Sequence, residues 1–327
     1  MSSLPKSSRP MISRRAILAG GAAVCGVAGK LAAAGSPPAR LETGAASSSF
    51  LLGLNTSTIR GQKLPIIDEI ALAAKAGFQG MEPWMDELRQ YAGSGGSLAE
   101  LGKRFRDAGI QVESAIDFFE WAVDDDARRA KGLDAARKSM EVLEKIGGKR
   151  LAAPPVGATE KPVDPLRVAE RYRKLLELGD QIGVVPQAEV WGFSRTLGRL
   201  GEAAQVAIET GHPRACILPD VFHLYKGGSP LEGIGLLGPA SIHVFHVNDY
   251  PAQPVRQKLT DADRVYPGDG VAPFKALLRT LGSAGFQVML SLELFNREYW
   301  KQDPLVVATK GLEKMKTLVA ASLGDQP

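Results

Sequence analysis

Four short apolar stretches in the second half of the sequence each end on a side chain that can bind a metal ion. These side chains are Glu189, Asp220, His246 and Glu293. Three carboxylates placed close together would repel one another and raise one another's pKa, and a bound dication removes this conflict. Ligands that are mostly oxygen atoms favour Mn²⁺, Mg²⁺ or Co²⁺, and the same set is compatible with Zn²⁺. The four residues therefore predict one divalent-metal site.

A second histidine stands close to His246 in the sequence, and strand geometry separates the two. Successive side chains of a strand point to opposite faces, so His243 and His246 cannot both face the interior of a barrel. His246 stands at the end of its apolar stretch, where a site would lie. We therefore expect His246 to bind the metal and His243 to pack beneath a helix.

A recurring junction divides the chain into units. Each junction has an amphipathic stretch, then a glycine, then a short apolar stretch, and glycine ends a helix in the left-handed conformation without steric cost. The junction glycines are Gly77, Gly109, Gly147, Gly183, Gly211, Gly238 and Gly285. Together with an apolar stretch at 50–55, these junctions predict eight strands, each followed by a helix.

The predicted helices lie between these junctions. Amphipathic helices are expected at 65–76, 97–108, 126–146, 165–182, 197–210, 274–283 and 304–318, and a shorter helix at 231–237. Strands and helices that alternate at this spacing imply a parallel sheet, and eight units in one chain fit an α/β fold of the (β/α)₈ TIM barrel class. A dinucleotide-binding fold is disfavoured because no glycine-rich phosphate loop follows the first strand. In a barrel of this kind, catalytic residues lie at the C-terminal ends of the strands.

Residues 1–34 have the composition of an export signal. Arg14 and Arg15 precede an uncharged run that is too short for an ordinary membrane-spanning helix, and Ala32 to Ala34 offer a small-residue cleavage site. We interpret this segment as a bacterial twin-arginine signal peptide, 35–48 as a linker and 49–327 as the barrel. The predicted location is the periplasm, reached through the twin-arginine export machinery. The alternatives are an uncleaved anchor and a basic tail.

The charge of the chain argues against nucleic acid as a partner. Five basic residues and no acidic ones precede residue 35, and without them the formal net charge falls from +4 to −1. A near-neutral chain lacks the basic surface that nucleic-acid binding requires. Cys25 and Cys216 are the two cysteines, and one of them lies in the leader, so no disulfide framework is expected. The oligomeric state is left open, and a homo-oligomer is compatible with the sequence.

The chain resembles the xylose-isomerase-like sugar phosphate isomerase/epimerase family, which includes ketose 3-epimerases and inosose-processing enzymes. The matching residues are Glu189, Asp220-x-x-His223, His246-Val247-Asn248-Asp249, Arg264 to Gly270 and Glu293. The resemblance implies that Glu189, Asp220, His246 and Glu293 hold one metal and that Glu189 and Glu293 are also the acid and base. It further implies that His223 and Arg264 steady the substrate oxygens. The gap between His246 and Arg264 is longer than in the family, which leaves open whether Arg264 or Arg256 reaches the substrate.

The chemistry implied by these roles is proton transfer next to a carbonyl group. A dication on the carbonyl and hydroxyl oxygens stabilises an enediolate, and a carboxylate on each side can remove and return the proton. The predicted function is therefore metal-dependent isomerisation or epimerisation of a small sugar or keto-sugar. Further candidates for substrate binding are Glu82 at the end of the second strand, and Trp84, Glu113 and Trp191 around the pocket.

Three alternatives compete with this interpretation. The first is a lyase or dehydratase for keto-sugars or keto-glycosides on the same barrel, in which proton removal ends in β-elimination. The second is a DNA-repair endonuclease, which the four histidines and the near-neutral charge argue against. The third is a non-catalytic sugar-binding barrel, which would not need two opposed carboxylates.

Overall fold

The computed structural model describes residues 50–324. The predicted signal peptide (1–34) and linker (35–48) lie outside the described residues. Within 50–324, no helix is long and apolar enough to cross a membrane.

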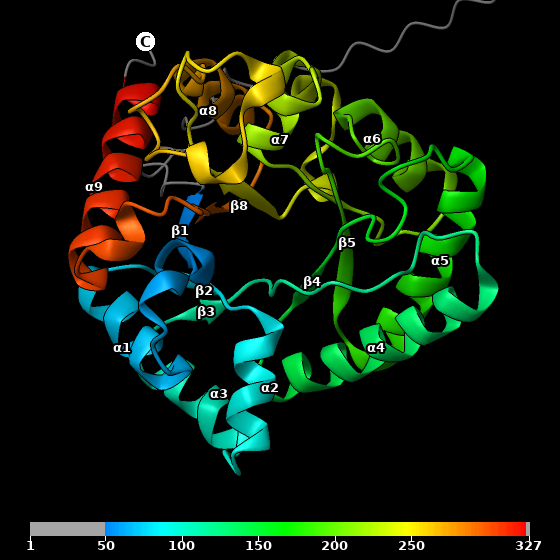
Figure 1. The fold of residues 1–327 in the computed structure, drawn as a ribbon, viewed down its shortest axis with the longest axis horizontal. Coiled ribbons are helices and arrows are strands. Elements are labelled where there is room, and N and C mark those ends of the chain that lie inside the picture. The colour runs from blue at the N-terminus through cyan, green and yellow to red at the C-terminus, as the bar shows by residue number, and fades with distance from the viewer. Residues whose placement is uncertain (1–49, 325–327) are drawn as a thin grey trace, which may run out of the picture. The chain divides into compact units, whose positions relative to one another are not determined.

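Eight parallel strands form the centre of the described part of the chain. The strands are β1 (Phe50–Asn55), β2 (Gly80–Glu82), β3 (Gln111–Val112), β4 (Arg150–Ala153), β5 (Val185–Glu189), β6 (Ile217–Leu218), β7 (Val244–Val247) and β8 (Val288–Leu292). They pair in two sheets, in the orders β3-β2-β1-β8-β7 and β4-β5-β6. Isolated parallel bridges join the sheets at both seams: Ala115 to Leu151 at one, and Ile217 to Ile242 and Asp220 to His246 at the other. The strands thereby close into a ring, as predicted (Figure 1).

Helices surround this ring, and most of them lie where the sequence predicts them (Figure 1). These are α1 (Ile66–Ala76), α3 (Leu98–Asp107), α4 (Asp126–Lys145), α5 (Pro165–Ile182), α6 (Leu200–Glu209), α8 (Phe274–Ser283) and α9 (Pro304–Leu323). The 3-10 helix η1 (Thr56–Gln62) and helix α2 (Met85–Gly93) were not predicted. Both follow strand ends directly, so they line the mouth of the barrel.

The prediction of a helix at 231–237 that ends at the junction glycine Gly238 is wrong in detail. Strand β6 is followed by the short helix α7 (Val221–Lys226), and the predicted segment is the 3-10 helix η2 (Leu231–Leu236). Gly238 has a φ of −85° and leads into the 3-10 helix η3 (Pro239–Ser241), because no α-helix ends there for it to terminate. The other six junction glycines have a positive φ, as predicted.

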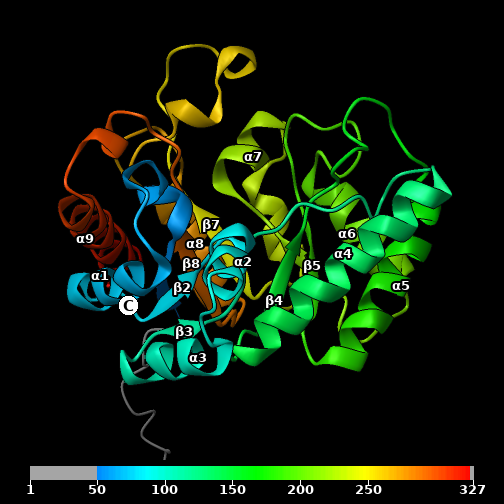
Figure 2. The same cartoon turned by 60° about the horizontal axis from the view of Figure 1, so that its bottom comes forward.

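The longest excursion from the barrel separates β7 from α8. It carries the short 3-10 helices η4 (Arg256–Lys258) and η5 (Asp261–Asp263). Figure 2 shows this segment, in yellow, rising beyond the strand ends. A further 3-10 helix, η6 (Tyr299–Lys301), precedes α9.

Apolar side chains fill the interior of the barrel beneath the mouth. Ile116, Ala152, Leu218, Val244 and Met289 form one buried cluster with members from both sheets. Two strands approach Met289 closely because they carry glycine: a Cβ at Gly53 or Gly80 would lie 2.5 or 2.7 Å from its sulfur. The interior is therefore a packed floor rather than a channel, and polar side chains gather above it.

Candidate metal centre

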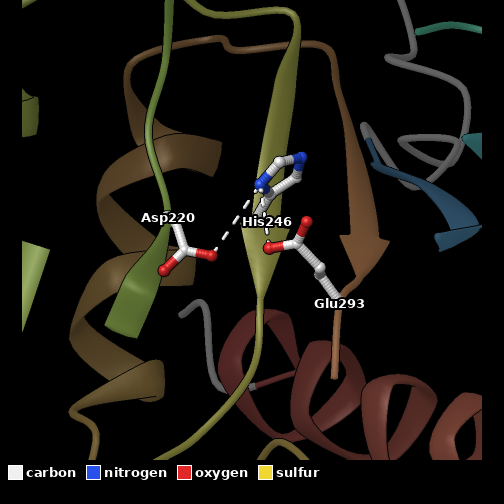
Figure 3. Close-up of side chains that lie close together, drawn as sticks. All are labelled: Asp220, His246 and Glu293. Atoms are coloured by element: carbon white, nitrogen blue, oxygen red, sulfur yellow. Dashed lines mark ion pairs between the residues drawn. The ribbon is translucent and has the colours of Figure 1, made fainter. Parts of the chain in front are cut away.

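Three of the predicted metal ligands converge at the C-terminal ends of their strands (Figure 3). Asp220 follows β6, His246 lies in β7 and Glu293 follows β8, and one ligand atom from each lies within 4.8 Å of the others. The Nδ1 atom of His246 is 3.2 Å from Glu293 Oε2 and 3.8 Å from Asp220 Oδ2. All three side chains are buried.

Glu189, the fourth predicted ligand, ends β5 and faces the same nitrogen. Its Oε1 atom is 3.9 Å from His246 Nδ1, which places it at the edge of the tighter group of three. Its Oε2 atom is buried and has no hydrogen-bond partner. Burial raises the pKa of Glu189 to about 8, although the charge of His246 lowers it.

The unsatisfied atoms in this cluster test whether a cation fits. His246 Nδ1 and Glu189 Oε2 are both buried without a hydrogen-bond partner. Such atoms cost free energy, so they are normally paired in a folded protein. A divalent ion between one imidazole nitrogen and the facing carboxylates would satisfy them, and the donor set therefore fits the predicted metal.

Glu82 contacts the His246 ring at Nε2, the nitrogen that does not face Glu189, Asp220 and Glu293. Its Oε2 atom is 2.9 Å from His246 Nε2 and accepts hydrogen bonds from Asn55 Nδ2 at 2.9 Å and from Ser291 Oγ at 2.7 Å. Glu82 is fully buried and its Oε1 atom has no hydrogen-bond partner, so its contact with substrate hydroxyls stays a prediction. Burial lowers the pKa of His246, but the negative charges of Glu293 and Glu82 outweigh it and raise that pKa well above its usual value.

Arg264 bridges two of the predicted metal ligands from inside the cluster. Its Nη1 donates to Asp220 Oδ2 at 2.9 Å and to Glu293 Oε2 at 2.7 Å, and its Nε donates to Asp261 Oδ1 at 3.1 Å. Burial raises the pKa of Asp220, but the charges of Arg264, His223 and His246 together outweigh this and lower it to about 2. Arg264 therefore lies among the predicted metal ligands, whereas the guanidinium carbon of Arg256 lies 5.8 Å from the centroid of the Tyr225 ring.

His223 lies in α7 beside Arg264. Its Nε2 is 3.2 Å from Arg264 Nη2, and Nδ1 is buried without a hydrogen-bond partner. An arginine only donates, so Nε2 accepts and the neutral ring carries its proton on Nδ1. Burial lowers the pKa of His223, which favours this neutral form.

Two asparagines to which the sequence reasoning gave no role complete the hydrogen-bond network. Asn55 ends β1 and donates to Glu293 Oε1 at 3.2 Å as well as to Glu82. Asn248 follows β7 and donates to Asp220 Oδ2 at 2.8 Å. The available signal was their position, because each polar residue ends an apolar strand as the metal ligands do.

The remaining predicted residues divide between the two ends of the barrel. Trp84 follows β2 and Trp191 follows β5, so both lie at the mouth that holds the metal ligands. Glu113 instead pairs with Lys149 and with Arg150 Nη1 at 2.9 Å, and Arg150 begins β4. Glu113 therefore lies at the opposite end, and the prediction that it lines the pocket is wrong.

His243 also lies away from the metal ligands, in agreement with the strand geometry. It borders a cavity with Glu113, Arg150 and Val288, the first residue of β8, rather than packing beneath a helix. The choice of His246 as the metal-facing histidine is therefore consistent with the arrangement of both side chains.

Known proteins resemble this chain in fold and, at lower than 30% identity in the cases below, in sequence. A family model described as a xylose isomerase-like TIM barrel matches residues 70–318. An inosose isomerase of Bacillus velezensis is 29% identical over 245 residues, which are 71% of this chain and 84% of that protein. A 3-dehydroshikimate dehydratase of Pseudomonas putida is 24% identical over 239 residues, which are 70% of this chain and 36% of that protein. A crystal structure of the IolI protein with a zinc atom has a TM-score of 0.77 and 22% identity, and the match covers 84% of this chain and 99% of that one.

Proposed function

The chain belongs to the xylose isomerase-like TIM barrel family, and from this premise we propose that it is a divalent-metal-dependent isomerase or epimerase of a small sugar or keto-sugar. The inosose isomerase relative supports this class of substrate and reaction. The observation that carries the proposal is the convergence of Glu189, Asp220 and Glu293 on the unpartnered Nδ1 atom of His246.

The residues that would hold the metal are Glu189, Asp220, His246 and Glu293. A dication bound there polarises the carbonyl and hydroxyl oxygens of a sugar and lowers the cost of removing the adjacent C–H proton. The IolI structure carries zinc on the same fold, so zinc belongs in any metal test beside manganese, magnesium and cobalt.

Glu189 and Glu293 are the proposed proton-transfer groups. Glu189 ends β5 and Glu293 follows β8, and these strands lie on different sheets, so the two carboxyl groups approach the centre from different sides. Glu189 is buried at the centre and its Oε2 atom has no hydrogen-bond partner, so this oxygen is available to take a proton from a bound substrate. One carboxyl group would take the proton from the carbon next to the carbonyl, and the other would return a proton to the substrate.

Arg264 and His223 are the proposed ligands of the substrate oxygens. Three carboxylates hold the Arg264 guanidinium in place, so it needs little reorganisation to face a developing oxyanion. The neutral His223 ring presents its Nδ1 proton as a further donor.

Turnover in D₂O tests the proposal. Purified protein is loaded with each metal and supplied with a panel of free sugars, keto-sugars and inososes, and the products are analysed by mass. Deuterium on the carbon next to the carbonyl is expected. Glu189→Gln and Glu293→Gln should each lower kcat by about 10²-fold or more, as expected for a lost general base. Rapid exchange in both variants would show that neither carboxyl group moves the proton.

A second candidate is a lyase or dehydratase on the same site. The dehydratase relative favours it, because that protein's name describes loss of water. Proton removal next to a carbonyl is the first step of both reactions. Product mass separates them, since an isomer keeps the mass of the substrate whereas elimination produces a smaller product.

The proposed place of action is the periplasm. This rests on the sequence of residues 1–34, in which Arg14 and Arg15 precede an uncharged run. Replacing both arginines by lysine should leave a folded protein in the cytoplasm, measured by fractionation and by sequencing the amino terminus. Normal export of this double variant would refute the twin-arginine assignment.

A further inference from the structure

A closed collar of aromatic side chains surrounds the metal-binding residues at the mouth of the barrel. We call Trp84, Phe118, Trp191, Phe193 and Phe295 the aromatic collar. Successive ring centroids are 6.0 Å apart for Phe295 and Trp84, 5.1 Å for Trp84 and Phe118, 6.1 Å for Phe118 and Trp191, and 5.2 Å for Trp191 and Phe193.

Two polar residues of the site close the collar. The ring of Phe193 is 5.7 Å from the ring of His223, whose Nε2 is 3.2 Å from Arg264 Nη2. The guanidinium carbon of Arg264 lies 5.0 Å from the Phe295 ring. Trp84 adds a third attachment, because its Nε1 donates to Asn55 Oδ1, and Asn55 donates to Glu293. The collar is therefore continuous with the groups that would hold the reacting sugar.

The outer rings of the aromatic collar are large and apolar, yet they are exposed to solvent. Phe118 is 45% and Phe193 is 51% exposed, whereas Glu189 and Glu293 are each only 4% exposed. Trp191 contacts both phenylalanines and is partly exposed. Large apolar rings grouped at the rim of a polar site are typical of a ligand-binding surface.

The charges around the collar favour a neutral ligand there. Arg60 stacks on Trp84 at 4.2 Å, but it already pairs with Asp86 and with Glu87 Oε1 at 3.1 Å. Arg264 is held by Asp220, Glu293 and Asp261. The charge of each of these collar-contacting cations is therefore balanced by carboxylates, whereas the aromatic faces can stack against a flat ring or the C–H face of a sugar.

We propose that Phe118, Trp191 and Phe193 form a subsite for a second ring of the substrate, so that the preferred substrates are neutral glycosides rather than free monosaccharides. The sugar ring at the metal centre would carry another sugar or an aryl group, and that group would lie against the collar. This inference rests on the proposed function, since it places the first ring at the metal site.

Binding of matched ligands to the manganese-loaded protein tests the subsite. The probes are free hexoses of several configurations and, for each hexose, its phenyl glycoside and a disaccharide that ends in the same sugar. Binding of each probe is measured by calorimetry and by the change in tryptophan fluorescence. At least one phenyl glycoside or disaccharide should bind about tenfold more tightly than its free sugar, which corresponds to one good aromatic contact. The phenyl and disaccharide arms show which kind of second ring is preferred.

Two exposed side chains provide the variants. Phe118→Ala combined with Phe193→Ala should weaken binding of the glycoside by a larger factor than binding of the free sugar, and so remove the advantage of the glycoside. The control is Leu166→Ala, which removes a 55% exposed apolar side chain from α5. Equal binding of every pair, absence of binding by all probes, or equal weakening of both members in the double variant would overturn the subsite. If the glycoside advantage persists but no deuterium exchange occurs with any substrate, the subsite stands and the proposed chemistry fails.

Discussion

At the residue scale, the histidine of the candidate metal centre is held from both sides. Glu82 lies against Nε2, and the other carboxylates face Nδ1. A carboxylate that accepts from the outer nitrogen of a metal-binding histidine fixes both its tautomer and its orientation. This arrangement explains why a fully buried glutamate is present where the sequence alone suggested a contact to substrate.

Glu82→Gln should therefore weaken metal binding while leaving the barrel folded. The amide keeps the size of the side chain but lacks the negative charge that holds the His246 N–H. Loss of such a partner typically lowers metal affinity about 10- to 100-fold. Calorimetric titration with Mn²⁺ and Zn²⁺ measures the change, with Glu113→Gln at the opposite end of the barrel as the control. An unchanged dissociation constant in Glu82→Gln would remove this role.

The two histidines of the seventh strand region give a second prediction. His246→Ala deletes the imidazole that faces three carboxylates, so the purified variant should contain no stoichiometric metal. His243→Ala deletes a side chain at the other end of the barrel and should retain it. Elemental analysis after dialysis against metal-containing buffer distinguishes the two. Retention of metal in His246→Ala together with its loss in His243→Ala would contradict the proposed metal-binding histidine.

Sequence reasoning brought the metal-facing residues together because strand ends in a parallel barrel share one mouth. It failed for Glu113, since a short apolar run does not show which of its flanking polar residues faces the barrel axis or which end of the strand a residue occupies. It could not choose between Arg256 and Arg264, because the path of the long segment after β7 depends on contacts with distant parts of the chain.

At the element scale, one helix carries a buried acid without a partner. Glu69 of α1 is 1% exposed, and its Oε2 atom has no hydrogen-bond partner. Burial, together with the nearby charge of Glu87, raises the pKa of Glu69 from 4.5 to about 9. The folded protein therefore keeps this proton over a pH range in which the unfolded chain has released it.

This difference predicts a falling stability at alkaline pH. The contribution of Glu69 is fully present below pH 4.5 and is lost progressively as the pH rises to about 9. The slope for one such group is at most about 1.4 kcal/mol per pH unit. Glu69→Gln stays uncharged, so its free energy of unfolding should exceed that of the parent increasingly between pH 6 and pH 9, within the range that the cited shift spans.

Urea unfolding at several pH values measures this prediction. Glu141→Gln on α4 is the matched control, because it makes the same change at an exposed position. Parallel pH profiles for Glu69→Gln and the parent would show that Glu69 is ionised in the folded protein.

The elements themselves were largely predictable, and the exceptions have a common cause. Amphipathic periodicity and junction glycines are local signals, and the long helices follow them. Helix α7 lacks such a signal because it is short and begins at a metal ligand: Asp220 Oδ1 accepts from the His223 backbone N–H at 2.7 Å and so caps the helix. The same residue thus serves the fold through one oxygen and the site through the other.

At the scale of the whole molecule, the candidate metal centre lies across a seam of the barrel. Glu189 ends β5 and Asp220 follows β6, and both strands are in the sheet β4-β5-β6. His246 lies in β7 and Glu293 follows β8, and both strands are in the other sheet. Across this seam, Ile217 bridges Ile242 and Asp220 bridges His246. A cation between these residues would therefore add a link where the strand pairing is sparse.

Metal binding should for this reason stabilise the barrel as well as support turnover. A ligand that binds only the folded state adds about 2.7 kcal/mol at a concentration one hundred times its dissociation constant. The melting temperature should rise when Mn²⁺ or Zn²⁺ replaces a chelator, and amide hydrogen exchange should slow most in β6, β7 and the residues between β6 and α7. Asp220→Asn should lose the metal-dependent part of both effects, whereas Glu113→Gln should keep it. For each variant, the melting temperature with metal is compared with that in chelator. This difference excludes any change that the substitution itself makes to the stability of the metal-free protein. A melting temperature that is the same with metal and with chelator would show that these four side chains do not hold a cation across the seam.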